Sequence, residues 1–409
     1  HRKHTQGGSM AKHNSGFPLF KSRAFSYQAL RTMGHACAFG ATLGECLGAV
    51  RTIRENDGES WFAAWGKAAV MCEKLSVSEG DRISRGKALL RAANYYRASE
   101  FFLPASDPRR RETYTRETDA FNRALKALGI PYHAWNVPYE RVSMRAYYFP
   151  GDPSLPVIMA CGGFDSSLEE LFFWIGHASI ERRHPCILFE GPGQSSMIRE
   201  YGLTFIPEWE KPLMILLDHA QWVAPEISQG QKIIAGVSMG GMLALRAASR
   251  DKRIHAAACL GGFFSMETAA FERLPRAARW AYRLGMKNTF DNLAHFAASR
   301  DMERKWALEH GMWVLGASSP SDLLEKTADF SLAPAAKDIT CHVLVVLGQN
   351  DHLVPATEGR VFQKHLTQAK SLKVVTLDTS TGAGEHCQAG ATERLHQVFF
   401  GWAEGISGR

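Results

Sequence analysis

Hydrophobic positions in the first third of the chain recur at the three- and four-residue intervals of amphipathic helices. Helices are expected from about residue 60, over 81–102 and over about 114–128. Pro104 ends the second of these helices, and Gly129 with Pro131 ends the third. The pattern therefore predicts a helical N-terminal domain over residues 10–133.

The pattern changes near residue 134, where short apolar runs begin to alternate with helical segments. The first run alternates apolar and polar residues, whereas the later runs are continuously apolar, which indicates strands covered on both faces. Strands are expected at 141–148, 156–160, 186–189, 232–235, 255–259, 342–347 and 372–377. The prediction is an α/β fold over residues 134–409, with a mostly parallel sheet between helices.

Residues of about 263–336 interrupt this alternation with a helix-like stretch rich in aromatic side chains, Trp280, Trp306 and Trp313 among them. The stretch lies between two predicted sheet strands, and insertions at that position often cover a pocket at the carboxyl edge of a sheet. We interpret it as a helical lid insertion. An ordinary helical excursion is the alternative.

Charge adds little to this picture. The net charge is +7, but the basic residues are mixed with acidic ones and no basic run appears, so nucleic-acid binding is not expected. The basic start, His1 to His4, precedes a Met at position 10. Residues 1–9 are interpreted as a cloning remnant and left out of the fold prediction.

Eight cysteines occur without a CxxC pair, and several lie in apolar runs. This distribution favours buried free thiols over a disulfide framework or a zinc site. No apolar stretch approaches the roughly 18 residues of a membrane span, and no signal peptide follows Met10. A cytoplasmic protein without membrane contact is expected.

The strongest chemical signal is the turn from Gly236 to Gly241, with Ser238 at its centre. It follows a predicted strand directly and precedes a predicted helix. Such a turn holds a serine in a strained conformation and lifts its hydroxyl above the sheet, where the helix N-terminus favours negative charge. The arrangement resembles the nucleophile elbow of α/β-hydrolases, and it makes Ser238 the predicted nucleophile.

A serine hydroxyl needs a base to take its proton and an acid to orient that base. Asp351 follows the strand 342–347 and is the predicted acid, with a turn aspartate as the alternative. His386 lies in a glycine-rich loop after the last strand and is the predicted base. His352 is adjacent to the acid and His365 lies in a helical run, so both fit the role less well.

The oxyanion hole requires two backbone donors, one of them from the residue after the nucleophile. Met239 supplies that N–H. The loop Cys161–Asp165 follows an earlier strand, and its paired glycines let the backbone approach a ligand closely. Phe164 is the expected second donor, with Gly163 as the alternative.

Asp165 stands beside this oxyanion loop, where an anion would repel the charge that develops on the substrate. A protonated or substrate-bound carboxyl could instead act as an acid. The alternative is a carboxylate that caps a helix beginning at Ser166 or Ser167.

Three stretches carry a closer resemblance: Gly162–Leu171, Phe189–Gln194 and Gly236–Gly241, together with the helical segment Gly86–Tyr96. They are similar to the 2,6-dihydroxypseudooxynicotine hydrolase-like group of α/β-hydrolases, which includes fungal yellowish-green pigment polyketide-shortening hydrolases. The resemblance extends from about residue 60 to near the C-terminus. Glu190 is one departure, because the group has Asp there, and we interpret it as a structural residue of the turn.

The resemblance implies a serine-dependent hydrolase of C–C bonds that needs no metal or organic cofactor, with Ser238, Asp351 and His386 as its triad. It also implies a catalytic role for the acidic residue at Asp165, and by analogy a homodimer. We expect a small-molecule substrate, a β-dicarbonyl or acyl-aromatic polyketide-like compound. The alternatives are an esterase or thioesterase, a cyclase or condensation catalyst on the same scaffold, and a hydrolase-like binding protein.

Overall fold

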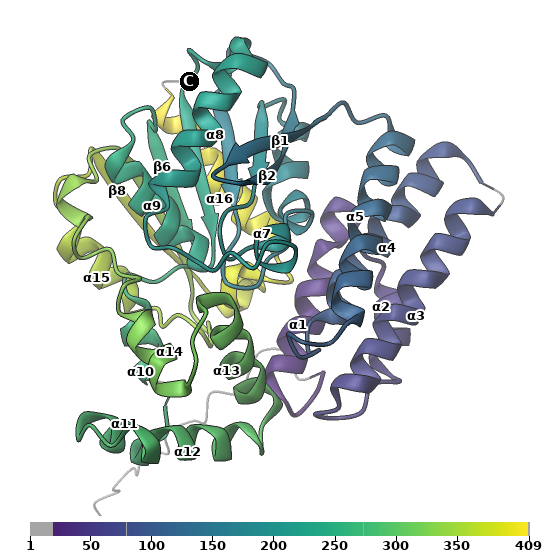
Figure 1. Ribbon diagram of the computed structural model, residues 1–409. Helices are drawn as coiled ribbons and strands as arrows, with labels where there is room; N and C mark the ends of the chain where they lie inside the picture. The colour runs from purple at the N-terminus through teal and green to yellow at the C-terminus, as the bar shows by residue number, and fades with distance from the viewer. Residues whose placement is uncertain (1–18, 79, 273, 408–409) are drawn as a thin grey trace, which may run out of the picture.

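The computed structural model describes residues 19–407 except 79 and 273, so the predicted cloning remnant lies outside the described residues. Within these residues, eight strands form one sheet in the order β1-β2-β4-β3-β5-β6-β7-β8 (Figure 1). The strands are β1 (His133–Tyr139), β2 (Val142–Phe149), β3 (Val157–Cys161), β4 (Cys186–Phe189), β5 (Lys232–Val237), β6 (Ala256–Leu260), β7 (His342–Gly348) and β8 (Ser371–Leu377). Strand β2 is antiparallel to β1 and β4, and the remaining neighbours are parallel. The predicted α/β fold class is confirmed.

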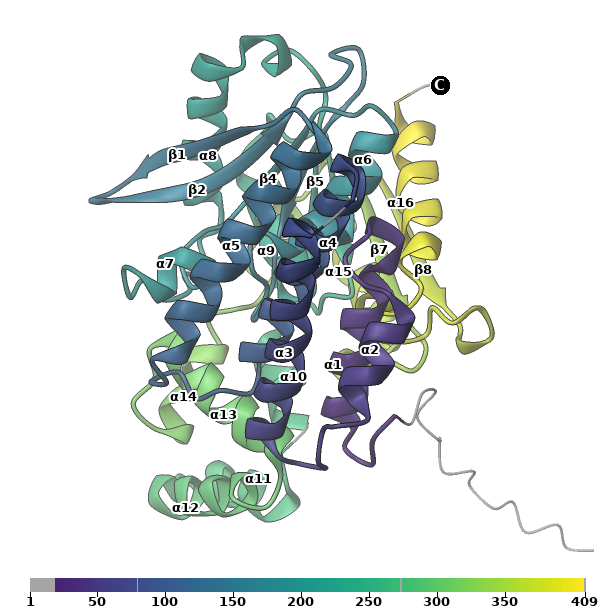
Figure 2. The same cartoon turned by 90° about the vertical axis from the view of Figure 1, so that its right-hand side faces the viewer.

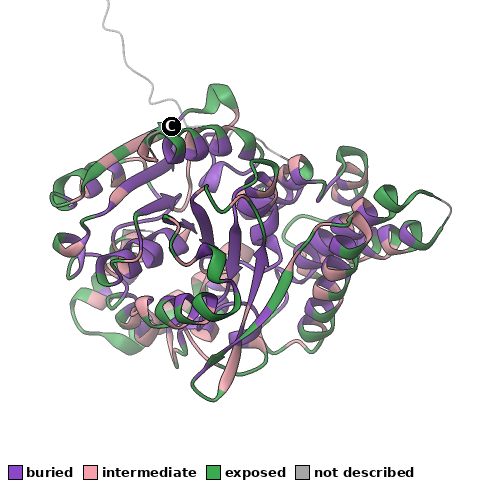
Figure 3. Ribbon diagram, turned by 90° about the horizontal axis from the view of Figure 1, so that it is seen from above, coloured by how far each residue is buried: buried purple, intermediate pink, exposed green. Residues whose placement is uncertain are grey.

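The apolar runs are continuous because each central strand is buried on both faces. In β3, Ile158 and Ala160 belong to one hydrophobic core, whereas Val157, Met159 and Cys161 belong to the core on the opposite face. Successive side chains of a strand point to opposite faces, so an alternating sequence would leave one of these cores incomplete. Figure 3 shows the buried strands at the centre and exposed residues on the outer helices.

Strand β1 is the element that the sequence pattern did not predict. It pairs with β2 from His133↔Tyr148 to Tyr139↔Val142 and lies at the edge of the sheet. Pro138 lies within the strand, which is tolerated at an edge but weakens a prediction from sequence. Burial alternates in most of β1, as expected of an edge strand with one exposed face.

Helices cover both faces of the sheet (Figures 1 and 2). Helices α8 and α9 supply apolar residues to one core, while α16 and the π-helical turn η2 supply them to the other. The helices interspersed with the strands are η2 (Phe172–Gly176), α6 (His177–Glu181), α7 (Ser195–Arg199), α8 (Glu210–Val223), α9 (Met239–Arg250), α15 (Glu358–His365) and α16 (Thr392–Ile406). Short helical turns are η1 (His35–Ala38), η3 (Pro225–Ile227), η4 (Ala336–Asp338), η5 (Thr379–Thr381) and η6 (His386–Gln388).

Five helices precede β1, within the stretch where a helical domain was expected. They are α1 (Arg23–Gly34), α2 (Leu43–Val50), α3 (Gly58–Val77), α4 (Arg82–Glu100) and α5 (Arg109–Leu128). Helix α5 begins at Arg109, whereas the sequence predicted a start near residue 114. The difference arises because the first turn of α5 is charged and has no apolar residue to mark it in the sequence. These helices share a continuous hydrophobic core with one face of the sheet. Phe121 of α5, for example, meets Tyr147 and Phe172 with ring centroids 5.3 and 5.4 Å apart.

A second helical group lies between β6 and β7, within the stretch 263–336. We call it the insertion helices: α10 (Met266–Glu272), α11 (Arg276–Arg283), α12 (Lys287–Ala298), α13 (Met302–Leu315) and α14 (Pro320–Thr327). In both side views they form a layer at one end of the sheet (Figures 1 and 2). Because α10 follows the carboxyl end of β6, this layer lies at the edge where the parallel strands end.

Trp61 tests how firmly the N-terminal helices are packed. Its side chain is fully buried, contacts Phe25 and Phe102, and donates to Ala98 O at 2.7 Å. We expect Trp61→Ala to lower the free energy of unfolding by about 3–5 kcal/mol, because it leaves a cavity. Chemical denaturation measures the change.

Trp222→Ala is the matched control, since that indole is 86% exposed on α8, and its effect should stay within about 0.5 kcal/mol. Equal losses for the two variants would contradict the packing described for α3.

Candidate active site

Ser238 occupies the sharp turn between β5 and α9. Its backbone has φ 59° and ψ −130°, a strained conformation for a residue with a side chain. The turn is possible because Gly236 and Gly240 approach so closely that a Cβ on Gly236 would lie 1.9 Å from Gly240 O. The predicted strand–turn–helix arrangement is therefore present, with the serine half-buried at the carboxyl edge of the sheet.

Two hydrogen bonds join Ser238 to His386 and Asp351. His386 Nε2 lies 2.8 Å from Ser238 Oγ, and Nδ1 lies 2.7 Å from Asp351 Oδ2. The other carboxylate oxygen accepts from the N–H groups of Leu353 and Val354 at 2.7 and 2.8 Å. These bonds fix the carboxylate, which in turn fixes the orientation of the imidazole.

The environment of His386 sets its proton affinity. Burial disfavours the imidazolium, but the charge and hydrogen bond of the adjacent Asp351 carboxylate, with a smaller contribution from Cys387, together outweigh burial and raise the pKa of His386 well above its ordinary value. The imidazole is thus a stronger base than a free histidine. This property suits a group that takes a proton from a hydroxyl.

The glycine loop after β3 lies directly against the turn. A Cβ on Gly163 would be 2.9 Å from both Met239 N and the Ser238 Cβ. Met239 is the first residue of α9, so its N–H has no partner within the helix. Gly163 N–H already donates to Ser166 Oγ at 3.3 Å, which favours Phe164 over Gly163 as the second oxyanion donor.

Glu190 and Gln194 hold this loop in place from the turn after β4. Gln194 Nε2 donates to Gly162 O at 2.5 Å. The Glu190 carboxyl accepts from the N–H groups of Arg145 and Ser196, both at 3.1 Å, and burial raises the pKa of Glu190 to about 7. These contacts agree with a structural role for Glu190. Gln194 belongs to a motif found in the sequence, but its role in positioning the glycine loop was not predicted.

Asp165 does not cap a helix at Ser166 or Ser167, so that alternative is wrong. The next helical turn begins at Glu170, and the N–H of Glu170 donates to Ser167 Oγ at 3.2 Å. Asp165 Oδ2 instead lies 3.1 Å from Arg31 Nη1. Arg31 therefore offsets the negative charge that Asp165 brings to the oxyanion loop.

Helix α1 supplies this arginine and two further contacts that the sequence did not reveal. Tyr27 Oη donates to the backbone oxygen of His386 at 3.2 Å, and Arg23 Nη2 donates to Asn350 O at 2.7 Å. The three side chains follow one another at four-residue spacing along α1. That spacing, which places them on one face of a helix, was the signal available in the sequence.

The insertion helix α13 lies over the oxyanion loop. His310 Nε2 is 2.9 Å from Phe164 O, and the Phe164 ring meets His310 and Trp306 with centroids 5.1 and 6.3 Å apart. Burial lowers the pKa of His310 to about 4, so near neutral pH the uncharged ring donates through Nε2.

Two absences hold for the part of the chain that the structure describes. There, His, Cys, Asp and Glu side chains form no group of three or more that could hold a metal ion. The described helices include none that is long and apolar enough to cross a membrane.

Comparison with known proteins gives relatives that span most of the chain. A family model described as serine aminopeptidase, S33, matches residues 190–376. The α/β hydrolase gkaG of Penicillium citrinum is 30% identical over 335 residues, which cover 78% of this chain and 78% of the relative. The 20-hydroxy-prefusarin hydrolase FUS2 of Gibberella moniliformis is 29% identical over 416 residues, 94% of this chain and 97% of the relative.

Among solved structures, that of the 2,6-dihydroxy-pseudo-oxynicotine hydrolase is similar with a TM-score of 0.71 and 20% identity, covering 92% of this chain and 95% of that protein. At this identity the similarity concerns the fold. It includes the helical N-terminal region, and it confirms the resemblance that the sequence motifs indicated.

The pKa of His386 can be measured directly. We expect its imidazole to titrate above pH 6.5 in an NMR titration, with the signal assigned by its absence in His386→Gln. Asp351→Asn should lower this pKa, because it removes the carboxylate that favours the imidazolium.

Asp378→Asn is the matched control, since Asp378 is exposed and its carboxylate accepts from Ser380 and Thr381 of its own turn. An imidazole that titrates at the same pH in wild type and Asp351→Asn would contradict the electrostatic coupling.

Proposed function

We propose that this chain, which belongs to the α/β-hydrolase family, is a serine-dependent hydrolase with Ser238 as its nucleophile. The observation that carries the proposal is the hydrogen-bonded series Ser238–His386–Asp351, mounted on a strained turn at the carboxyl edge of the sheet. Family membership gives the hydrolase class, and the geometry of these three residues supports the assignment of roles.

In the first half-reaction, His386 takes the proton of Ser238 as the hydroxyl attacks the substrate carbonyl. The N–H groups of Met239 and Phe164 receive the negative charge of the tetrahedral intermediate. His386 then gives the proton to the departing group, and the acyl group stays on Ser238. In the second half-reaction, His386 activates water, which releases a carboxylic acid and restores the serine.

We propose a C–C bond in a β-dicarbonyl or acyl-aromatic, polyketide-like compound as the target. Its cleavage leaves an enolate-type carbon that His386 or another acid must protonate. One relative is named a 20-hydroxy-prefusarin hydrolase, and the structural neighbour is a 2,6-dihydroxy-pseudo-oxynicotine hydrolase; both names support a substrate larger than a simple ester. In this proposal Asp165 polarises the substrate from beside the oxyanion loop, and Arg31 holds the Asp165 carboxylate in place.

Ester or thioester hydrolysis is the second candidate, because the same three residues and the same oxyanion donors suffice for it. Cyclisation or condensation on this scaffold is the third, and it would require that water be kept from the acyl intermediate. The insertion helix over Phe164 favours an enclosed site and so bears on all three reactions.

Replacement of the nucleophile tests the proposal. We expect Ser238→Ala to lower kcat by roughly 10³-fold or more, since related serine hydrolases lose up to about 10⁶-fold on such a change. Candidate acyl compounds are incubated with each protein and analysed by mass spectrometry. Hydrolysis yields an acid and a second product whose masses sum to substrate plus one water, whereas cyclisation does not add water.

Ser380→Ala is the control, because that serine is exposed in the turn after β8. Full activity in Ser238→Ala would exclude both C–C bond hydrolysis and ester or thioester hydrolysis by Ser238. A product without added water would favour the cyclase or condensation alternative.

A further inference from the structure

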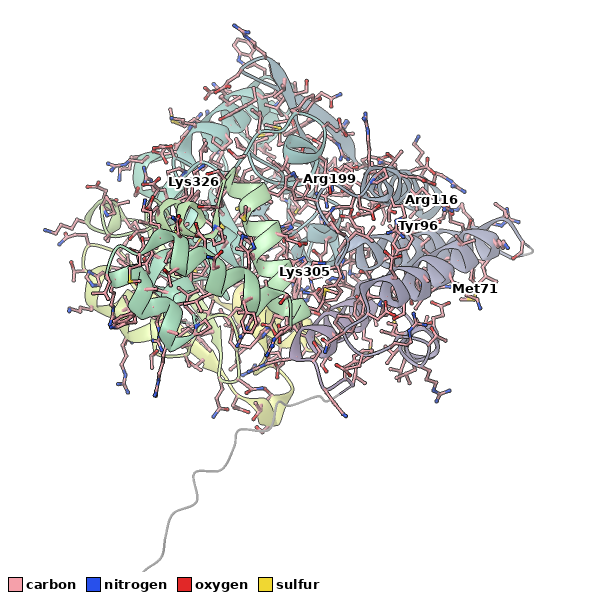
Figure 4. The ribbon with its side chains drawn as sticks, turned by 60° about the horizontal axis from the view of Figure 1, so that its bottom comes forward. Met71, Tyr96, Arg116, Arg199, Lys305 and Lys326 are labelled. Atoms are coloured by element: carbon pink, nitrogen blue, oxygen red, sulfur yellow. The ribbon has the colours of Figure 1, made fainter. Side chains whose placement is uncertain are left out.

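Two of the insertion helices, α11 and α12, lie at the outer end of their layer. In both side views the other insertion helices stand between this pair and the strands (Figures 1 and 2). Figure 4 brings this end of the molecule forward, with Lys305 of α13 and Lys326 of α14 labelled in the layer. Helix α11 therefore turns one side toward the layer and the other toward the surroundings.

The inner side of α11 is packed. Ala278 and Ala281 are buried in a small hydrophobic cluster with Phe290 of α12 and Leu324 of α14, and Tyr282 packs against the same cluster. Because these contacts all come from one side of the helix, they fix which side of α11 faces outward.

The outward side combines basic and apolar side chains. Arg276, Trp280 and Leu284 follow one another at four-residue spacing, which places them on one side of a helix. Trp280 is 62% exposed and Leu284 56%, and Arg283 and the nearby Met286 are exposed as well. We call these five residues the outer face of α11. Exposed apolar side chains normally occur singly on a protein surface, and a group of them marks an interaction site.

The same helix is strongly basic. It contains Arg276, Arg279 and Arg283 and no acidic residue. None of these guanidinium groups forms an ion pair with another residue that the structure describes, whereas Lys287 in the next helix pairs with Glu325 at 2.5 Å. An interaction partner of this surface must therefore tolerate three positive charges beside an apolar patch.

We propose that the outer face of α11 binds an anionic lipid membrane. Indole and aliphatic side chains insert at the boundary between headgroups and acyl chains, and arginines of the same helix bind the negatively charged headgroups. A second copy of this chain fits the face less well, because a two-fold contact would bring the same arginines against one another.

A membrane contact of this kind leaves no long apolar run in the sequence. The expectation of no membrane contact rested on the length of a spanning segment, whereas a helix that lies on the surface inserts only one of its sides. The insertion helices lie at the edge of the sheet that carries Ser238, so the contact would bring the candidate site close to the bilayer. Binding itself does not depend on the proposed function.

Cosedimentation with vesicles tests the proposal. Wild type is mixed with vesicles of phosphatidylcholine alone and with vesicles that contain roughly 30% phosphatidylserine. We expect about tenfold more bound protein, or a larger excess, with the anionic vesicles, and this excess should fall at high salt. If wild type binds neither vesicle, or binds both equally, the proposal is overturned.

Two separate variants locate the binding surface. One combines Trp280→Ser with Leu284→Ser, and the other combines Arg276→Gln, Arg279→Gln and Arg283→Gln. Each should lower binding to the anionic vesicles roughly tenfold. Circular dichroism melting checks that each protein is folded, and either variant suffices for the test if the other fails to fold. Unchanged binding by a folded variant would contradict the proposal.

Matched controls separate this face from net charge and from exposed apolar groups in general. Arg51→Gln, Arg85→Gln and Arg111→Gln together remove three exposed arginines from the N-terminal helical region, and Trp222→Ser removes an exposed indole from α8. Both controls should bind as wild type does. An equal loss in the two arginine variants would assign the binding to net charge and overturn the proposal.

Light scattering covers the other occupant. A wild-type dimer that becomes a monomer in the Trp280→Ser, Leu284→Ser variant, without vesicle binding by wild type, would assign the outer face of α11 to a second copy of this chain and overturn the proposal.

Discussion

A buried ion pair between Arg31 and Glu170 joins the N-terminal helices to the loop that forms the candidate site. The guanidinium makes two bonds to the carboxylate, at 2.7 and 2.5 Å, and a third nitrogen reaches Asp165. Removing one partner of such a buried pair costs about 3–5 kcal/mol, because the other charge is left without compensation. The pair therefore fixes the register of α1 against the loop after β3. With α1 so placed, Tyr27 meets the backbone of His386, and Arg23 meets the loop that carries Asp351. The helical N-terminal region is thus part of the candidate site as well as of the shared core.

The sheet supplies the second constraint. Parallel strands deliver Ser238 after β5, the glycine loop after β3 and Asp351 after β7 to one edge, where their side chains meet. Glycines at positions 163, 236 and 240 permit the close backbone contacts between the loop after β3 and the turn that carries Ser238. From the other side, α13 contacts Phe164 through His310. The hydroxyl consequently lies between a rigid sheet edge and two helical groups, and the N-terminal group brings Arg31 to Asp165 beside the oxyanion loop.

Local patterns in the sequence were sufficient to predict the fold class and the meeting of Ser238, Asp351 and His386 at one edge of the sheet, because each of these residues follows a strand or lies in a recognisable turn. They failed where the outcome depends on distant partners. Strand β1 was missed because Pro138 and an exposed face obscure its pattern. The helix-cap interpretation of Asp165 was wrong because Arg31, more than a hundred residues earlier, takes its carboxylate. Nothing near Arg97, Arg110 or Arg199 in the sequence indicates that three separate helices, α4, α5 and α7, bring these side chains close together.

Ser238 is the group that we propose attacks the substrate. Covalent labelling tests it most directly: the protein is incubated with a p-nitrophenyl alkylphosphonate, and the modified peptide is located by mass spectrometry. We expect one phosphonate per chain, on Ser238, formed far more slowly in His386→Ala because the hydroxyl then lacks its base. Stoichiometric labelling of a different residue, with loss of hydrolysis, would contradict it.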